Sequence, residues 1–412
     1  MKTDLDGWMA ERGYAALLVL GGAAHNPPMY YLANGATVTE RTVLVQPRGG
    51  APVLYVSAME RDEARRSGLE VRTALPRLTE LRGDSDELTA TARWLGELLV
   101  ENGVRGGTVA AYGQADLGAG HALLTALAEL HPQYNVVGEF SGGVLHRARL
   151  TKDAAEAKRI RAVGTKTMRV VAGTEAFLTR HRAKNGVLVK KDGAPLTVGD
   201  VKAHIRSLLQ AEHIVDPEDG TIFAIGRDAG VPHSRGNDAD VMALGRSIVY
   251  DIFPAEPGGG YYFDFTRTWC LGYAPPEVAA AYKDVMAAFK AVMAALKPGE
   301  LCRTYQHLTC DILEARGHPT LRTDPRGVEG YVHSLAHGVG LEIHEAPSFS
   351  GVKTNDDRLE PGMVVTIEPG LYYPERGYGV RVEDCVWLNP ATNKFEALGR
   401  YHKRLVLHGP NW

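Results

Sequence analysis

The first 145 or so residues alternate short apolar runs with longer segments of mixed polarity. Five runs rich in apolar and β-branched residues predict β-strands at 14–20, 41–46, 52–57, 107–113 and 134–140. Residues 85–103 predict a helix, with Ser85 or Asp86 as its N-cap and Gly103 just beyond its end. This alternation of strands and helices predicts an α/β layer domain over residues 1–150.

The pattern changes near residue 150. In residues 147–173 the apolar positions recur at helical spacing and the charged positions fall on the opposite face. We expect this long helix to open a second domain over residues 151–412. Two further helices are predicted at 197–213 and 275–299, the latter with prolines at its start and Pro298-Gly299 at its end. Residues 181–196 are basic and rich in turn-forming residues, which predicts a surface excursion.

Composition narrows the class of protein. A chain of 412 residues favours two domains. With 44% hydrophobic residues, 23% charged residues and a net charge of −3, the chain gives no reason to expect nucleic acid or an anionic membrane as a partner. The N-terminal segment lacks the apolar core of a signal peptide, and the four cysteines show no CxxC spacing. We therefore expect a cytoplasmic protein with free thiols.

Two segments place carboxylates on either side of a predicted turn. Asp251 and Asp264 flank the proline- and glycine-rich stretch in "DIFPAEPGGGYYFDF", and we expect them to face each other in an antiparallel hairpin. Glu368 and Glu383 flank "PERGYG" in the same way. Cross-strand partners project to one face of a sheet, and four inward carboxylates without a cation would repel one another. The alternative is that all four are ordinary solvent-facing positions.

A histidine segment, "YVHSLAHGVGLEIHEAP", lies between these two regions. His333 and His337 are four residues apart and share a face in either a helix or a strand. His344 follows Gly338 and Gly340, which allow close approach of the backbone. The sequence "HEAPS" has no second histidine, so the segment is not an HExxH zinc motif. Three histidines within 12 residues, beside two pairs of carboxylates, favour a functional site over solvent-facing positions.

The motifs together resemble a known family. The hairpin ending in "DFTRT", then "AHGVGLEIHE", "IEPGLY" and "VRVEDCV", occur in the order found in the pita-bread metallopeptidases. The resemblance covers the chain from about residue 155 to the end. The α/β domain at the N-terminus is similar to that of the branch containing prolidase, aminopeptidase P and creatinase. The resemblance implies a creatinase-like α/β domain over residues 1–150 and an α+β pita-bread catalytic domain over residues 151–412.

The resemblance also implies two divalent metal ions per subunit, Mn²⁺, Zn²⁺ or Co²⁺. Asp251 would chelate one ion, Asp264 and Glu383 would bridge both, and His337 and Glu368 would complete the second site. Carboxylate oxygens with one imidazole suit these ions. Hydrolysis would proceed through a hydroxide that bridges the metals, with Glu368 accepting and returning its proton.

Further site residues follow from the same resemblance. His233 in "VPHSRG" matches the upstream active-site histidine of the family, and His333 and His344 match histidines that donate hydrogen bonds to the substrate and to the developing oxyanion. Arg381 matches an arginine of the Xaa-Pro-cleaving members. It could hold the bridging Glu383 or the carboxylate of the substrate.

The expected substrate is a small peptide with proline at its second position, and Xaa-Pro dipeptides are favoured. The alternatives are an aminopeptidase P that acts on longer peptides, a metal-free pita-bread binding module, and the metal-free creatinase. All five ligand positions are filled, which favours the metallopeptidase. A homodimer is also expected. The chain departs from the family in a longer first hairpin, with Phe253 where a glycine is common, and in the basic residues 181–196.

Overall fold

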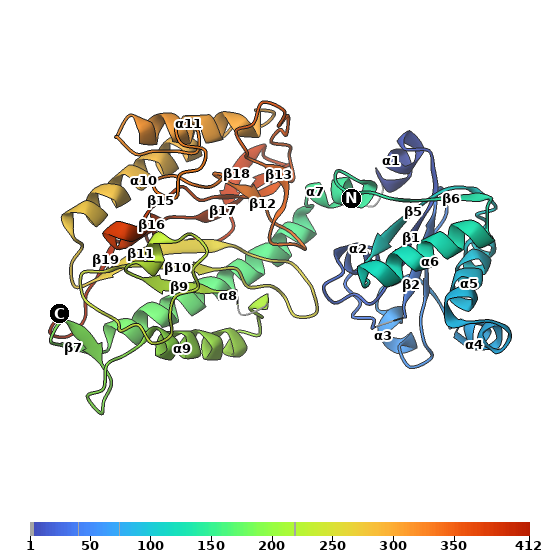
Figure 1. The fold of residues 1–412 in the computed structure, drawn as a ribbon, viewed down its shortest axis with the longest axis horizontal. Helices are drawn as coiled ribbons and strands as arrows, with labels where there is room; N and C mark the ends of the chain where they lie inside the picture. The colour runs from blue at the N-terminus through green and yellow to red at the C-terminus, as the bar shows by residue number, and fades with distance from the viewer. Residues whose placement is uncertain (1–3, 40, 74, 218–219) are drawn as a thin grey trace. The chain divides into compact units, whose positions relative to one another are not determined.

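The computed structural model describes residues 4–39, 41–73, 75–217 and 220–412. The chain divides into two compact units (Figure 1): residues 1–149 with 258–260, and residues 150–257 with 261–412. Within the described part of the chain, every helix is too short or too polar to cross a membrane.

The first unit is built on a six-stranded sheet of order β4-β3-β2-β1-β5-β6. Its strands are β1 (Tyr14–Leu20), β2 (Val43–Pro47), β3 (Val53–Tyr55), β4 (Glu70–Arg72), β5 (Gly107–Gly113) and β6 (Tyr134–Gly138). The β1–β2–β3 pairs are antiparallel, whereas β1–β5–β6 and β3–β4 are parallel. The five strands predicted from the sequence are confirmed, and β4 was not predicted.

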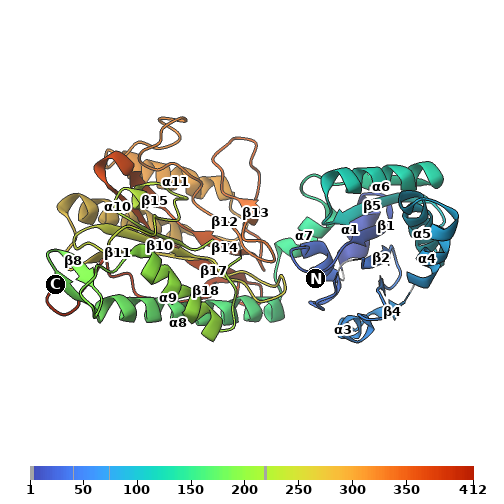
Figure 2. The same ribbon diagram turned by 60° about the horizontal axis from the view of Figure 1, so that its bottom comes forward.

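Seven helices are described in or at the end of this unit: α1 (Leu5–Glu11), α2 (Pro27–Leu32), α3 (Arg61–Arg65), α4 (Leu75–Asp84), α5 (Glu87–Glu101), α6 (Leu117–Leu130) and α7 (Val144–Leu150). The predicted cap of α5 is confirmed, because the Asp86 side chain accepts a hydrogen bond from the Thr89 amide at 3.0 Å. Trp94 and Leu98 of α5 share a buried core with Leu18 of β1. Figure 2 shows α5 and α6 beside this sheet.

The second unit contains two principal sheets. One has the order β19-β11-β10-β9, from β9 (Ile222–Ile225), β10 (Ser247–Ile252), β11 (Phe265–Leu271) and β19 (Val406–Leu407). The other has the order β13-β12-β14-β17-β18, from β12 (His337–Gly338), β13 (Glu345–Ser348), β14 (Val364–Ile367), β17 (Asp384–Asn389) and β18 (Lys394–Ala397). A two-stranded ladder joins β15 (Gly370–Tyr373) to β16 (Tyr378–Arg381).

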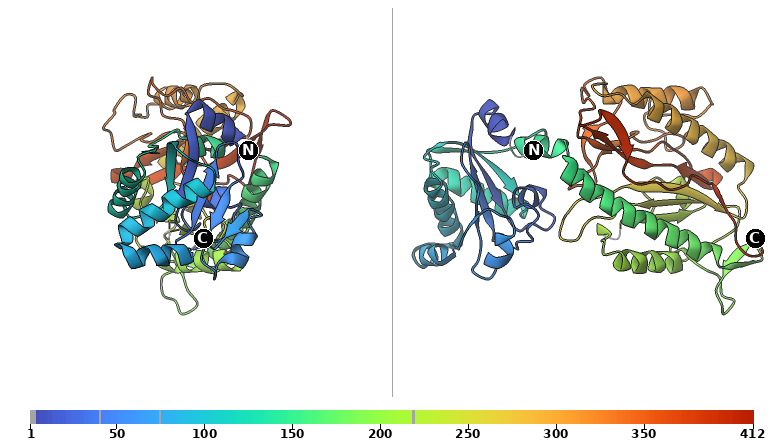
Figure 3. Two further views of the ribbon diagram at one scale, coloured as in Figure 1. Left: turned by 90° about the vertical axis from the view of Figure 1, so that its right-hand side faces the viewer. Right: turned by 180° about the vertical axis from the view of Figure 1, so that it is seen from behind.

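Helices cover these strands from two sides (Figures 1 and 3), with α8 (Ala154–Thr179) and α9 (Val198–Ala211) on one side and α10 (Pro276–Ala295) and α11 (Cys302–Glu314) on the other. The predicted long helix is confirmed as α8, but it begins at Ala154 and not at residue 147, because residues 147–150 end α7 and a capping box between Asp153 and Glu156 opens α8. Val285 of α10 packs in one core with Val365 of β14 and Val380 of β16. Helix α11 was not predicted.

Residues 181–196 form a β-hairpin, from β7 (Arg182–Lys184) and β8 (Val187–Val189), followed by a turn. Leu188 and Leu196 are buried, so the apolar side of this segment packs against the second unit. Its exposed charged and turn residues, which include Lys184, Asn185, Gly186 and residues 191–193, fit the predicted surface excursion.

The β10–β11 hairpin corrects one prediction. Asp251 lies opposite Thr266, and Asp264 lies diagonally, two residues before Thr266 and just outside β11. The turn therefore centres between Gly258 and Gly259, which both have positive φ (81° and 91°), one residue later than expected. Because residues two apart share a face, both aspartates still project to the same side.

The second carboxylate pair has the predicted register. Ile367 lies opposite Asp384 in the β14–β17 ladder, and Gly370 lies opposite Arg381 in the β15–β16 ladder. Between these two ladders the same register sets Glu368 opposite Glu383.

Candidate active site

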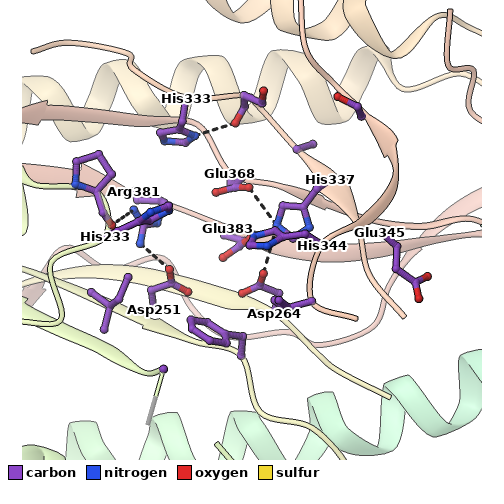
Figure 4. Close-up of a pocket in the computed structure, with 18 of the residues that line it drawn as sticks. His233, Asp251, Asp264, His333, His337, His344, Glu345, Glu368, Arg381 and Glu383 are labelled. Carbon is purple, nitrogen blue, oxygen red and sulfur yellow. Dashed lines mark hydrogen bonds and ion pairs between the residues drawn. The ribbon is translucent and has the colours of Figure 1, made fainter. Parts of the chain in front are cut away.

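One cavity of about 590 Å³ in the second unit collects every site residue that the sequence suggested (Figure 4). Its lining includes His233, Asp251, Asp264, His333, His337, His344, Glu368, Arg381 and Glu383. They come from β10, β12, β16, the segments beside β11 and β14, and the loops before β12 and β13. Residues distant in sequence therefore meet at the junction of the two principal sheets.

The centre of this group is three side chains whose ligand atoms all lie within 4.8 Å of one another: Asp264, His337 and Glu383. His337 Nε2 is 3.4 Å from Asp264 Oδ2 and 3.3 Å from Glu368 Oε1. Asp264 and Glu383 are 4% and 1% exposed, so their carboxylates have almost no access to bulk water.

The orientation of His337 is fixed by its own strand. Its Nδ1 lies 3.0 Å from the carbonyl oxygen of Gly338, and a carbonyl can only accept a hydrogen bond. In the neutral form of the ring the proton therefore sits on Nδ1, and the lone pair of Nε2 faces Asp264 and Glu368. This is the arrangement in which a histidine binds a metal ion while its other nitrogen is anchored by a hydrogen bond.

The protein supplies these carboxylates with few hydrogen-bond donors and counter-charges. Burial and then the nearest carboxylate raise the pKa of Asp264, Glu368 and Glu383 well above the ordinary value. Glu383 Oε1 and Asp251 Oδ1 are buried and have no hydrogen-bond partner among the described residues. Buried oxygens without donors, next to an imidazole lone pair, are what divalent cations would satisfy. The donor set therefore fits the metal ions that the family resemblance implies.

Arg381 departs from its expected contacts. Its Nη2 is 2.5 Å from Asp251 Oδ2, and its Nη1 donates to the Tyr372 hydroxyl at 2.7 Å and the Pro232 carbonyl at 3.2 Å. Its Nε donates to Thr266 Oγ1 at 3.3 Å. Arg381 is only 3% exposed and makes no ion pair with Glu383. Four of the five N–H groups of its guanidinium thus have partners in the protein, and the one directed at Asp251 orients that carboxylate.

His333 belongs to the same network. Its Nδ1 donates to the Ser334 carbonyl at 2.7 Å, so its Nε2 accepts from the Tyr372 hydroxyl at 2.9 Å. Burial and the charge of Arg381 lower the pKa of His333 to about 3, which keeps the ring neutral. The segment 333–336 is neither helix nor strand, so the expected shared face with His337 arises from irregular backbone.

His233 and His344 are the two exposed histidines of the lining. The His344 ring packs edge-on against His337, with 4.4 Å between the ring centroids. Loss of hydration in the cavity and the neighbouring His337 lower the pKa of His344 to about 4. At neutral pH this ring is therefore uncharged and carries one N–H donor.

Sequence reasoning missed two contributors. Thr266 donates to Glu383 Oε2 at 2.7 Å, and Tyr372 joins His333 to Arg381. Both carry a signal that could have been read: Thr266 follows Asp264 by two residues and so shares its face, and Tyr372 lies four residues beyond Glu368.

A cavity in which four carboxylates and an imidazole converge is typical of a metal-dependent hydrolase. The chain belongs to metallopeptidase family M24, whose sequence profile matches residues 158–390, and it is therefore an enzyme of the metallopeptidase class. It is 30% identical over 383 residues to the probable dipeptidase PepE of Mycobacterium tuberculosis, covering 92% of this chain and 88% of that protein.

Solved structures confirm the predicted fold class, an α/β N-terminal domain followed by a pita-bread domain. The prolidase of Pyrococcus horikoshii aligns with a TM-score of 0.74 at 22% identity, covering 98% of this chain and 99% of that one. The X-Pro aminopeptidase of Thermotoga maritima aligns with a TM-score of 0.74 at 21% identity over 98% of this chain and 99% of that chain. The fold is thus common to dipeptidases and aminopeptidases and does not separate them.

Proposed function

We propose that this protein is a dinuclear-metal peptidase that hydrolyses the bond before proline, with a preference for Xaa-Pro dipeptides. The observation that carries the proposal is the convergence of four carboxylates and one imidazole, that of His337, in a single cavity. The likeness to dipeptidases over most of the chain supports the same reading.

The metal ligands in this proposal are Asp251, Asp264, His337, Glu368 and Glu383. Divalent cations held by such a set lower the pKa of water and polarise a carbonyl oxygen. The chain itself fixes the ligands: Arg381 holds Asp251, Thr266 holds Glu383, and the carbonyl of Gly338 holds His337. Mn²⁺, Zn²⁺ and Co²⁺ all suit these donors.

The remaining residues handle protons and substrate. Glu368 accepts a proton from the attacking water and returns it to the leaving amine. His344 donates a hydrogen bond to the carbonyl oxygen as negative charge develops there, and His233 contacts the substrate from the other side of the cavity. His333 positions Arg381 through Tyr372.

The substrate preference rests on the lining of the cavity. Ile222, Phe253 and Ile343 give it apolar walls that suit a proline ring. A dipeptide also ends in a carboxylate directly after that ring, and this charge needs a cationic or hydrogen-bonding partner when water is excluded. Two arginines, Arg235 and Arg381, line the cavity, and we assign this contact to their guanidinium groups.

Removing and restoring metal tests the central claim. Chelation of the purified protein should abolish hydrolysis of Xaa-Pro dipeptides, and Mn²⁺, Co²⁺ or Zn²⁺ should restore it. Metal analysis of the active protein should find two ions per chain. Full activity in metal-free protein would contradict the proposal, and a folded protein that neither binds metal nor cleaves peptides would support the binding-module alternative.

A substrate panel separates dipeptidase from aminopeptidase P. Xaa-Pro dipeptides, tripeptides and pentapeptides should be compared in the presence of Mn²⁺, and the dipeptides should give the highest kcat/KM. Equal or faster cleavage of the pentapeptides would make the protein an aminopeptidase P. Efficient removal of a residue that precedes alanine or leucine would overturn the proline preference.

We further propose a cytoplasmic homodimer. Sedimentation analysis of the purified chain should give twice the mass of 44.7 kDa, and a monomer at working concentrations would contradict it.

A further inference from the structure

The loop that carries His344 has little regular structure of its own. Between Gly338 at the end of β12 and Glu345 at the start of β13 the chain forms a succession of bends. The His344 ring has no hydrogen-bond partner among the described residues, and its ring contact is with His337. The position of His344 in the cavity therefore depends on what holds this loop.

Glu345, the next residue, anchors the loop through hydrogen bonds to its backbone. Its Oε1 accepts hydrogen bonds from the backbone amides of Leu341 at 3.0 Å and Glu342 at 3.3 Å. The carboxylate occupies space that a side chain at residue 340 would need, because a Cβ on Gly340 would lie 2.2 Å from Glu345 Oε2. The glycine thus permits the carboxylate to fold back onto the loop. Figure 4 shows Glu345 pointing away from Asp264 and Glu383, so it is not part of the carboxylate group.

Lys152 holds the other oxygen of this carboxylate. Its Nζ is 2.7 Å from Glu345 Oε2, and the two side chains are 2% and 6% exposed. Lys152 stands directly before the N-cap of α8, and its backbone amide donates to the carbonyl of Gly362 at 2.7 Å. The ammonium group is therefore fixed by backbone that does not belong to the loop.

We propose that Lys152 and Glu345 are positioning residues that fix His344 in the cavity. An ion pair buried to this degree contributes little net stability, because removing both charges from water costs about as much as their attraction returns. The ion pair contributes more to the geometry of the loop than to stability, because it connects three residues of the loop, Leu341, Glu342 and Glu345, to the start of α8. This inference rests on the proposed function for the role of His344, although the position of the loop can be measured without activity.

The activity test uses Lys152→Met and Glu345→Gln. Each should lower kcat for Xaa-Pro dipeptides by about 10- to 30-fold, within the range for residues that orient an active-site group, with KM changed less than about twofold. Metal content should remain that of the wild type. Lys403→Met is the control, because it removes a partly buried lysine, 24% exposed, that is paired with a carboxylate, Asp384, outside the lining of the cavity.

A double-mutant cycle distinguishes positioning from general stabilisation. In the His344→Ala background, Lys152→Met should lower kcat less than about twofold, because the group that it positions is already gone. A loss of kcat in that background as large as in the wild type would overturn the inference, and so would an unchanged kcat in both single variants. Should Lys152→Met fail to fold, Glu345→Gln provides the same cycle with almost no change in volume.

The position of His344 can also be read directly. In metal-free protein, the rate at which diethylpyrocarbonate modifies His344, measured by mass spectrometry of the peptides, should rise several-fold in Lys152→Met and stay unchanged in Lys403→Met. An unchanged rate in Lys152→Met would overturn the positioning role. A changed rate in a protein without peptidase activity would preserve that role and reject the proposed function.

Discussion

Two groups of buried charges lie on opposite faces of the same strands and are treated differently by the fold. Arg267 follows Thr266 on β11, and Asp384 follows Glu383 at the start of β17, so the members of each neighbouring pair point to opposite sides. On one side is the Arg267 cluster, formed by Arg267, Asp384 and Lys403. On the other is the carboxylate cluster, formed by Asp251, Asp264, Glu368 and Glu383.

In the Arg267 cluster every charged group has a partner within the protein. Arg267 Nη2 is 2.8 Å from Asp384 Oδ1, and Lys403 Nζ is 2.5 Å from Asp384 Oδ2. The guanidinium also donates to the backbone carbonyls of Thr266, Glu383, Tyr401 and His402. Each of its nitrogens therefore has a partner within the protein.

In the carboxylate cluster, by contrast, the protein does not supply a partner for every charged group. Four carboxylates face one guanidinium, that of Arg381, and one imidazole, that of His337. Two of their oxygens have no donor among the described residues, and the pKa of three of the carboxyls is raised. Because the strands and the degree of burial are shared, the contrast isolates the cause: one cluster is closed by protein groups, and the other requires cations from outside.

The largest expected effect comes from Glu368. Glu368→Gln keeps the volume of the side chain but removes its charge and its ability to accept a proton. We expect kcat to fall by about 10³ or more, about 4 kcal/mol, as for a residue that is both ligand and base. The melting temperature should show that the fold is retained. A loss of less than about tenfold in kcat would contradict the assigned role.

Replacing either buried arginine, Arg267 or Arg381, tests the difference between the two clusters. Arg267→Met and Arg381→Met should each lower the free energy of unfolding by about 3 kcal/mol, because each removes one partner of a buried ion pair. Excess Mn²⁺ should restore much of the stability of Arg381→Met, since divalent cations neutralise the same carboxylates. It should not restore Arg267→Met. Equal rescue of both variants, measured by denaturant unfolding, would show that the two clusters do not differ as described.

The sequence predicted which residues form the site better than it predicted the contacts among them. Pairs of carboxylates beside turn residues, and histidines beside glycines, are local signals, and all nine candidate residues line one cavity. The register of β10 and β11 was wrong because it depends on how Gly258 and Gly259 turn the chain. The partner of Arg381 could not be read from its distance to Glu383, because Asp251 lies 130 residues away along the chain. The pairing of Lys152 with Glu345 had no local signal at all.

A smaller effect is expected from His344. His344→Ala should lower kcat by about 30-fold, about 2 kcal/mol, with little change in KM, because its donor strengthens its hydrogen bond only as charge develops on the substrate. Since its pKa is lowered to about 4, the ring should remain a neutral donor from pH 5 upwards. Steady-state kinetics with a Xaa-Pro dipeptide measure both constants. A change confined to KM would make His344 a residue that binds the ground state.

The last prediction concerns the pH dependence of the stabilisation that metal provides. The pKa of Asp264, Glu368 and Glu383 is raised in the folded protein above the unfolded value of about 4. Protonation of these groups therefore stabilises the metal-free fold, fully below about pH 4, and this contribution is lost as pH rises through the folded pKa. His333 and His344, with lowered pKa values of about 3 and about 4, act in the opposite sense, since their contribution is lost as pH falls.

Comparing metal-loaded with metal-free protein at each pH largely removes the histidine contribution and leaves the carboxylates. Mn²⁺ must displace whatever protons they hold, so its stabilising effect should grow with pH, by about 1.4 kcal/mol per pH unit for each proton displaced. Melting temperatures with and without Mn²⁺ should therefore diverge between pH 6 and pH 8, and calorimetry in two buffers should detect proton release on binding. A constant difference in melting temperature would mean that the carboxylate cluster is already fully ionised without metal, and that it is less in need of external cations than its contrast with the Arg267 cluster implies.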